Sequence, residues 1–314
     1  MQLFLSGGGS SRRSKVSLAP GSDRLGGVPE LPDVEGYRKF FARHATGRTV
    51  REVVVPDATI VRNASPDALD QALRDHKFAE PERLGKWLIC WTDGPALLLH
   101  FGMTGDLIWS GDEPERHRHD RVILVLDGGD ELRYRNMRKL GGAWLAHDRQ
   151  EVDAILGVLG PDALSVGKRA FLERLSARRG QAKAVLMDQR FLAGPGNLIV
   201  DEVLWQARIH PRRRVETLTD DERVELYRKL HKVLKESVDH YDYVPRKRSW
   251  LSHVRGLPGA LCPRCRTPLS RITTAGRTTY FCPNCQLMND QAPVPTSAAR
   301  PRTRAARRSR PPGR

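Results

Sequence analysis

Pro29-Glu30-Leu31-Pro32-Asp33-Val34-Glu35 places a carboxylate directly after a proline. If residues 1–28 are absent from the working protein, Pro29 presents a free secondary amine beside Glu30. Such an amine can attack the anomeric carbon of a sugar and become an iminium, while the adjacent carboxylate moves protons. An α-amino group has an unperturbed pKa of about 8, so a useful fraction is neutral at physiological pH. With residues 1–28 attached, the same nitrogen is an unreactive tertiary amide.

The same heptapeptide also suits the beginning of an ordinary helix. Pro32 is well placed for a first helical turn, and acidic residues are favoured in that turn. The residues that recur at helical spacing are Val34, Tyr37, Phe40, Phe41 and His44. On its own the segment is more often a helix N-terminus than a reactive site, so the rest of the chain must distinguish the two.

The charge of the chain points to a polyanionic partner. The net charge is +16 over 314 residues. Residues 1–27 contribute +3 and residues 286–314 contribute +6, which leaves +7 for the body of the chain. A basic body with a more basic tail indicates a polyanionic partner, with nucleic acid as the first candidate. The alternative is that the surface charge only keeps the protein soluble.

Four of the five cysteines form two Cys-x-x-Cys pairs separated by sixteen residues. This is the spacing of a four-cysteine zinc ribbon that holds one structural Zn²⁺, and the alternative is two reduced thiol pairs without metal. The expected ligands are Cys262, Cys265, Cys282 and Cys285. The fifth cysteine, Cys90, lies in an apolar run and is expected in a buried strand. Arg277 stands at the tip of the hairpin between the two pairs.

Nothing in the chain predicts export or membrane insertion. The apolar start at residues 3–5 is too short for a signal peptide, and no stretch is long enough to span a bilayer. The cysteine usage does not indicate an oxidising compartment. We therefore expect a cytoplasmic, nucleoid-associated protein.

The first half of the chain has the pattern of strands and the second half that of helices. After a helix from about Pro32 to His44, alternation predicts strands with a hairpin turn at residues 127–130 and a short helix at Pro66–His76. The expected strands begin near Val50 and continue at Trp87–Trp91, Ala96–Phe101, Val122–Leu126, Leu132–Tyr134 and Ala143–Leu145. The expected later helices are Val152–Leu159, Lys168–Arg178, Ala182–Asp188, Asn197–Ala207 and Asp220–Val238.

These patterns predict an α+β multidomain protein. Residues 29–150 should form a β-sandwich with flanking helices, 151–256 a helical domain and 257–288 the zinc ribbon. Residues 1–28 are expected to be disordered or untranslated, and 289–314 to be a disordered basic tail. The turn Gly194-Pro195-Gly196-Asn197 opens a helix, where backbone N–H groups can hold a phosphate, although most such turns merely reverse the chain.

In order and spacing, these segments resemble the formamidopyrimidine-DNA glycosylase and endonuclease VIII family of helix-two-turn-helix repair enzymes. The resemblance covers residues 29 to about 286. Its pieces are Pro-Glu-Leu-Pro-Asp-Val-Glu at 29–35, Arg-Leu-Gly-Lys-Trp-Leu at 83–88, Leu-His-Phe-Gly-Met-Thr-Gly at 99–105, Arg-His-Asp at 118–120, Arg-Lys-Leu-Gly at 138–141, Leu-Met-Asp at 186–188, Gly-Pro-Gly-Asn at 194–197 with Glu202, and the zinc hairpin with Arg277.

The resemblance implies a role for each matching residue. Pro29, as the mature N-terminus, attacks C1′ of a damaged nucleotide, and Glu30 shuttles protons. Lys86 donates a proton and contacts phosphate in β-elimination, while Arg277 holds phosphates and assists δ-elimination. The implied DNA contacts are made by His100, Met103, His119, Arg138, Leu140, Asn197 and Arg277. Among these, Met103, Arg138 and Leu140 fill the stack that a flipped nucleotide vacates.

The chain also departs from the family pattern. Family chains begin at a methionine before this proline, whereas Val28 stands here behind 27 residues. A valine codon such as GUG can initiate with methionine, which aminopeptidase removes before proline, so we expect Pro29 to be free; proteolytic removal of 1–28 is the alternative. Leu140 replaces a frequent phenylalanine, Gly142 is an additional residue, and Ile199 replaces a tyrosine.

The expected function is that of a monomeric bifunctional DNA glycosylase and AP lyase acting on damaged double-stranded DNA. The segment 236–255 is shorter than the lesion-capping region of 8-oxoguanine enzymes and lacks their Gly-Gly-x-Thr. This argues against 8-oxoguanine and leaves oxidised pyrimidines, formamidopyrimidines and abasic sites open. The main rival is a catalytically inactive zinc protein that binds damaged DNA, and a second is an unrelated zinc-ribbon nucleic-acid protein.

Overall fold

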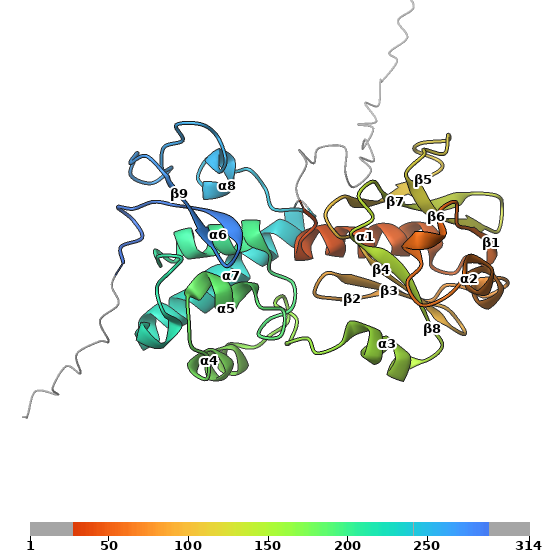
Figure 1. Ribbon diagram of the computed structural model, residues 1–314, viewed down its shortest axis with the longest axis horizontal. Coiled ribbons are helices and arrows are strands. Elements are labelled where there is room, and N and C mark those ends of the chain that lie inside the picture. The colour runs from red at the N-terminus through yellow and green to blue at the C-terminus, as the bar shows by residue number, and fades with distance from the viewer. Residues whose placement is uncertain (1–27, 241, 289–314) are drawn as a thin grey trace, which may run out of the picture.

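The computed structural model describes residues 28–240 and 242–288 and has two lobes. A β-rich lobe forms one side of the molecule, and a helical lobe with a small hairpin forms the other (Figure 1). The expectations for residues 1–27 and 289–314 fall outside the described residues. Among the described residues, none of the helices combines the length and apolar character needed to span a bilayer.

The β-rich lobe contains two four-stranded antiparallel sheets, which confirms the predicted sandwich. One sheet has the order β1-β6-β7-β5 and the other β2-β3-β4-β8. Their strands are β1 (Val50–Val54), β2 (Glu82–Leu84), β3 (Trp87–Trp91), β4 (Ala96–His100), β5 (Gly105–Trp109), β6 (Asp120–Leu126), β7 (Glu131–Asn136) and β8 (Gly142–Ala146). The helices are α1 (Leu31–Ala45), α2 (Pro66–Leu73) and α3 (Arg149–Leu156), with a 3-10 turn η1 at Ala58–Ile60.

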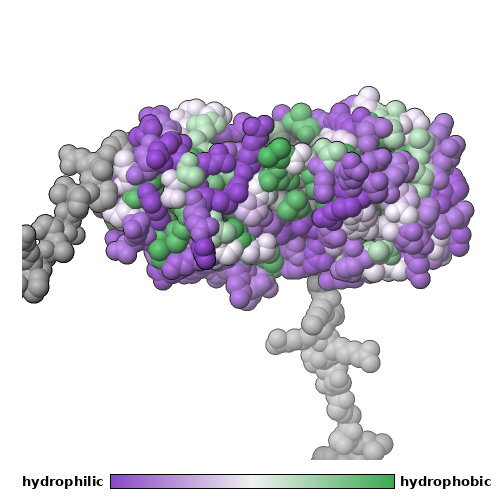
Figure 2. All heavy atoms as spheres, turned by 90° about the horizontal axis from the view of Figure 1, so that it is seen from below, coloured by the Kyte–Doolittle hydropathy of each residue, from purple (hydrophilic) through white to green (hydrophobic). Residues whose placement is uncertain are grey.

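Strand alternation explains how this lobe is packed. Leu97 and Leu99 of β4 point into a core shared by both sheets, whereas Leu98 between them belongs to a smaller cluster with Val152 of α3. Cys90 is fully buried in β3, as predicted. Elsewhere the exposed hydrophobic residues form small groups on a mostly hydrophilic face (Figure 2), which is usual for a protein surface.

The helix α1 joins the two lobes. Its residues Val34, Tyr37 and Phe41 lie in the sandwich core, whereas Leu31 lies in the core of the helical lobe. Lys39 Nζ donates to the Val238 carbonyl at 2.8 Å and pairs with Asp242 at 2.6 Å. The helix predicted from the opening heptapeptide therefore fixes the orientation of one lobe against the other (Figure 1).

The helical lobe follows the predicted order, with three helices ending slightly earlier than predicted and the longest one slightly later. Its helices are α4 (Lys168–Ser176), α5 (Ala182–Met187), α6 (Asn197–Gln206), α7 (Asp220–His240) and α8 (Leu251–Val254), with a 3-10 turn η2 at Val215–Thr217. The zinc hairpin consists of β9 (Ser270–Thr274) and β10 (Arg277–Phe281). The helix α3 ends at Leu156 rather than at Leu159, because Gly157 adopts φ +65° and terminates it. The elements that were not predicted are β2, β5, α8 and the two 3-10 turns, since each is short or begins with residues that break the apolar pattern.

Candidate active site and zinc centre

The N-terminal segment is docked on the glycine-rich turn that opens α6. The Glu30 carboxylate accepts hydrogen bonds from three backbone N–H groups, those of Gly196 at 3.0 Å, Leu198 at 2.8 Å and Ile199 at 3.0 Å. A Cβ on Gly196 would lie 2.4 Å from Glu30 Cδ, so only glycine permits this approach. The backbone N–H groups expected to hold a phosphate are instead occupied by the protein's own carboxylate, which the positive end of α6 favours.

A cavity of about 300 Å³ brings together six of the predicted site residues. It is also lined by Gly85, Gly102, Leu159 and Gln189, so it is built from both lobes and the zinc hairpin. The six residues are Pro29, Lys86, His100, Met103, Leu140 and Arg277. Four other predicted residues, Glu30, His119, Arg138 and Asn197, are described but lie outside this lining.

Burial shifts the titration of two groups in the cavity. Burial lowers the pKa of Lys86, the nearby Arg277 cation lowers it further, and the carboxylates of Glu30 and Asp33 oppose both effects. Burial, assisted by the charge of Lys86, lowers the pKa of His100 to about 4. At neutral pH His100 is therefore an uncharged ring, and its Nδ1 accepts a hydrogen bond from the Gly102 N–H at 3.2 Å. A lysine with a lowered pKa releases a proton more readily than one in water.

Two loops beside the cavity present exposed apolar side chains. Met103 is 38 % exposed and Leu140 is 54 % exposed, and both also line the cavity. The loops are tied together, because Thr104 Oγ1 accepts from the Arg138 N–H at 3.0 Å and donates to Asn136 Oδ1 at 3.2 Å. Met137, which the sequence did not single out, is 55 % exposed on the same loop.

His119 lies next to these loops on the surface. Its carbonyl accepts from the Asn136 N–H at 2.9 Å, and its Nδ1 lies 3.0 Å from the guanidinium of Arg121. Partial burial and several neighbouring cations, first among them Arg118, lower the pKa of His119. These charges disfavour the protonated form of the ring, and the ring of His117 lies beside it with centroids 5.0 Å apart.

Asn197 connects the entry of α6 to the zinc hairpin. Its amide donates to the Thr278 carbonyl at 3.1 Å, next to Arg277. Its Oδ1 is buried without a hydrogen-bond partner. The residue therefore fixes the hairpin to the start of α6.

A buried ion pair beneath the hairpin was missed by sequence reasoning. Lys183 of α5 and Asp201 of α6 are completely buried and lie 2.6 Å apart. Arg255 also pairs with Asp201, at 2.9 Å. The signal in the sequence was one charge inside apolar α5 and two adjacent charges inside apolar α6, which periodicity alone assigns to a solvated face.

A second ion-pair network, also missed, supports Lys86. Arg83 pairs with Glu35 at 2.8 Å and with Asp162 of the other lobe. Asp162 also accepts from the N–H of Gly85 at 2.7 Å, so the residue before Lys86 is fixed to both lobes. Burial alone would lower the pKa of Arg83, but hydrogen bonds and charge interactions with the two carboxylates raise it overall.

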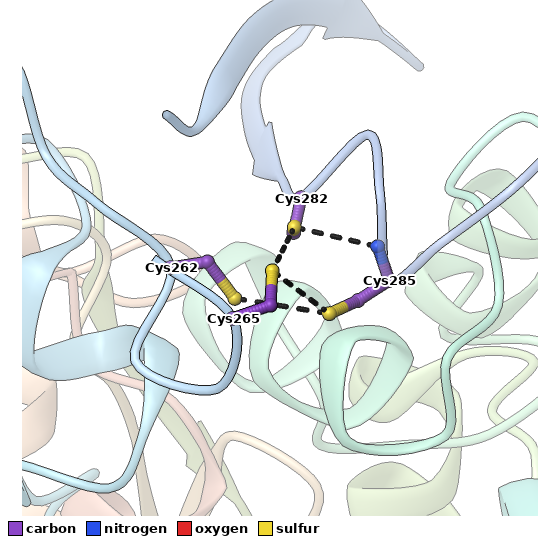
Figure 3. A group of neighbouring side chains, drawn as sticks. All are labelled: Cys262, Cys265, Cys282 and Cys285. Carbon is purple, nitrogen blue, oxygen red and sulfur yellow. Dashed lines mark hydrogen bonds between the residues drawn. The ribbon is translucent and has the colours of Figure 1, made fainter. Parts of the chain in front are cut away.

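The four predicted cysteines meet at one point (Figure 3). All four sulfur atoms lie within 4.8 Å of one another. Individual separations are 3.9 Å for Cys262–Cys285, 3.5 Å for Cys265–Cys282 and 3.4 Å for Cys265–Cys285. Tetrahedral zinc with bonds of about 2.3 Å requires sulfur separations of about 3.8 Å. The donor set and its geometry fit one structural Zn²⁺.

Comparisons with known proteins agree with this arrangement. The family model for the formamidopyrimidine-DNA glycosylase N-terminal domain matches residues 28–143, that for its H2TH domain 159–244, and that for the zinc finger found in FPG and IleRS 259–287. The Chloroflexus aurantiacus formamidopyrimidine-DNA glycosylase is 35 % identical over 277 residues, which cover 84 % of this chain and 99 % of the relative. The Heliobacterium modesticaldum protein of the same name is 36 % identical over 283 residues, covering 82 % and 100 %.

Solved structures of Lactococcus lactis Fpg share the fold. Its complex with abasic-site DNA has a TM-score of 0.74 and 28 % identity, covering 82 % of this chain and 100 % of that one. The complex of the wild-type protein with DNA containing N7-benzyl-Fapy-dG also has a TM-score of 0.74 at 28 % identity, with the same coverage. On sequence, fold and zinc ligands together, this chain belongs to the formamidopyrimidine-DNA glycosylase family.

Proposed function

We propose that this protein is a bifunctional DNA glycosylase and AP lyase of base excision repair, with Pro29 as its nucleophile. The observation that carries the proposal is the cavity in which Pro29, Lys86 and Arg277 meet although they lie far apart in the sequence. An amine, a lysine with a lowered pKa and an arginine are the groups that imine formation and phosphate elimination need. A protein that only binds damaged DNA has no use for this combination, so the inactive alternative is less well supported.

In the proposed reaction the free Pro29 nitrogen bonds to C1′ of a flipped nucleotide and the damaged base leaves. Glu30 protonates the sugar ring oxygen, and the open sugar becomes an iminium. The Glu30 carboxylate then takes the C2′ proton, and the 3′ C–O bond breaks with the phosphate as leaving group, to which Lys86 donates a proton. A second elimination, assisted by Arg277, releases the 5′ phosphate. Water finally hydrolyses the imine and restores the amine.

DNA contacts follow from the exposed groups around the cavity. Met103, Arg138 and Leu140 are proposed to fill the vacated stack, because a side chain there partly offsets the cost of unstacking. Contacts to the DNA backbone supply much of the affinity in such complexes. The residues proposed to make them are His100, His119, Arg138, Asn197 and Arg277. Damaged double-stranded DNA is the proposed partner, since the Lactococcus structures contain abasic-site and N7-benzyl-Fapy-dG DNA.

The decisive experiment is borohydride trapping on duplex DNA with one abasic site. Protein that begins at Pro29 should form a covalent adduct, and the full chain with residues 1–28 retained is the matched control, because its Pro29 nitrogen is an amide. Intact mass of the native protein then shows which form is made in cells. If the Pro29 form gives no adduct with any damaged duplex, the enzyme proposal fails and the inactive DNA-binding alternative replaces it.

The same proposal includes a monomeric state and association with the nucleoid. It also includes domain boundaries at 29–150, 151–256 and 257–288. The cavity lined by residues from both lobes of one chain supports the monomer, because no second chain is needed to complete it. Light scattering after gel filtration should give the mass of one chain, with and without DNA. A dimer that persists in the presence of DNA would overturn this part.

A further inference from the structure

Arg62 holds the loop that carries Leu140. This loop comprises residues 137–141 between β7 and β8 and is called the Leu140 loop below. The Arg62 guanidinium donates from Nη2 to the Lys139 carbonyl at 2.8 Å and to the Gly141 carbonyl at 2.5 Å. Its Nε also donates to Gly141, at 3.2 Å. One planar group thus binds the carbonyl before Leu140 and the carbonyl after it.

The two glycines after Leu140 make room for this arrangement. A Cβ on Gly142 would lie 2.8 Å from Arg62 Nε and 2.9 Å from its Cγ. A Cβ on Gly141 would lie 1.9 Å from the His100 carbonyl oxygen. The loop is also strained, since Lys139 adopts φ +51°, a left-handed conformation that a lysine rarely takes. Such a conformation persists only where surrounding contacts enforce it.

Arg62 is itself fixed to the sandwich. Its N–H donates to the Ala143 carbonyl of β8 at 3.0 Å, and Val61 forms a bridge with the same residue. On the inner side, the fully buried Asn136 accepts from the Lys139 N–H at 2.9 Å. The Leu140 loop is therefore held from both sides while the Leu140 side chain remains exposed.

We propose that Arg62 is a positioning residue that keeps Leu140 preformed for insertion into the DNA stack. This inference rests on the proposed function. An exposed leucine on a free loop would fold back on the protein, and ordering it at the moment of binding would reduce affinity and rate. Lysine cannot replace Arg62, because a single ammonium lacks the planar fork that reaches both carbonyls.

Single-turnover excision of a formamidopyrimidine from duplex DNA tests the proposal with Arg62→Lys, which keeps the charge. We expect the rate to fall about tenfold, whereas cleavage at an abasic site in single-stranded DNA, which needs no stack filling, stays within about twofold of wild type. In a Leu140→Ala background, Arg62→Lys should cause no further loss, because both changes remove the same effect. A further loss of rate in the Leu140→Ala background would show that Arg62 contacts phosphate directly. An equal loss of rate on single-stranded DNA would show general damage to the protein. Either result would overturn the proposal.

Hydrogen exchange of the free protein separates this inference from the proposed function. The amides of Arg138 and Lys139 should exchange about tenfold faster in Arg62→Lys, whether or not the protein cleaves DNA. Gly142→Ala is the second variant: its new methyl group displaces the guanidinium while Arg62 itself is retained, and it should reproduce both effects. Unchanged exchange in both variants would refute the positioning role, even if the wild-type enzyme is fully active.

Discussion

Lys183 Nζ lies 2.6 Å from Asp201 Oδ1, and neither side chain reaches solvent. Lys183 also donates to Thr279 Oγ1 at 2.7 Å, in β10, the strand that begins at Arg277. Asp201 in turn accepts from Arg255 at 2.9 Å. Burial lowers the pKa of Lys183, and the charge of Asp201 opposes that shift. The pair thereby connects α5 and α6 to the hairpin, and it sets the place of Arg277 over the cavity.

Replacing Lys183 with methionine should destabilise the protein severely. Asp201 would remain buried with Arg255 as its remaining charged partner, and loss of one member of a buried ion pair typically costs about 3 to 5 kcal/mol. Urea unfolding of Lys183→Met against wild type measures this cost. The matched control is Lys168→Met on the exposed start of α4, which should change stability by less than about 0.5 kcal/mol. Equal effects of the two substitutions would contradict the structural role given to the pair.

Sequence alone predicted local chemistry well and distant pairing poorly. Cys262 and Cys265 are three residues apart, so their spacing reports the zinc site directly. Glu30 was recognised as a proton carrier, but its hydrogen bonds to α6 join residues more than 160 positions apart, which no local pattern records. Arg62 likewise resembled any surface arginine, because its partners become neighbours only after β7 and β8 have folded.

Glu30→Gln separates chemistry from binding. A neutral amide cannot carry the proton, so incision should fall at least about 100-fold. The amide also offers one acceptor oxygen where the carboxylate offers two, leaving a buried N–H at the start of α6 unpaired at a cost of about 1 to 3 kcal/mol. Affinity for duplex DNA with an uncleavable abasic analogue should change by less than about threefold, because phosphate contacts dominate binding.

Incision by Glu30→Gln within about tenfold of wild type would remove Glu30 from the mechanism. Unfolding by urea, measured in parallel, shows whether the variant is folded at the assay temperature. Val28 is exposed and next to Pro29, so the comparison must use protein from which residues 1–28 have been removed.

Removal of the zinc ligand Cys262 should release the hairpin while the sandwich stays folded. Cys262→Ser is expected to contain no zinc by elemental analysis and to bind damaged duplex at least about tenfold more weakly, since Arg277 loses its support. The sandwich core contains none of the four ligands and should keep its unfolding transition. Cys90→Ala, in that core, is the control and should retain one zinc per chain. Full zinc content in Cys262→Ser would disprove the four-cysteine site.

Glu202 makes the stability of the protein depend on pH. Burial raises the pKa of Glu202 to about 7, although hydrogen bonds from Gln206 at 2.8 Å and from the Ser252 N–H at 2.9 Å oppose the shift. Between the ordinary carboxyl pKa of 4.5 and about 7, the folded state binds a proton that the unfolded state has released. The contribution of this bound proton to the free energy of unfolding is therefore complete below pH 4.5, declines as the pH rises, and is lost above pH 7.

The decline attributable to Glu202 should total about 3 kcal/mol in the free energy of unfolding. Glu202→Gln replaces the group with a neutral amide that does not titrate, and Gln206 can rotate its own amide to keep the hydrogen bond. Urea unfolding at half-unit steps from pH 4.5 to 7.5 measures the difference in stability between this variant and wild type. As the pH rises, this difference should shift steadily in favour of the variant. A difference that stays constant across that range would show that Glu202 is ionised in the folded protein throughout, and that its hydrogen bonds outweigh the cost of its burial.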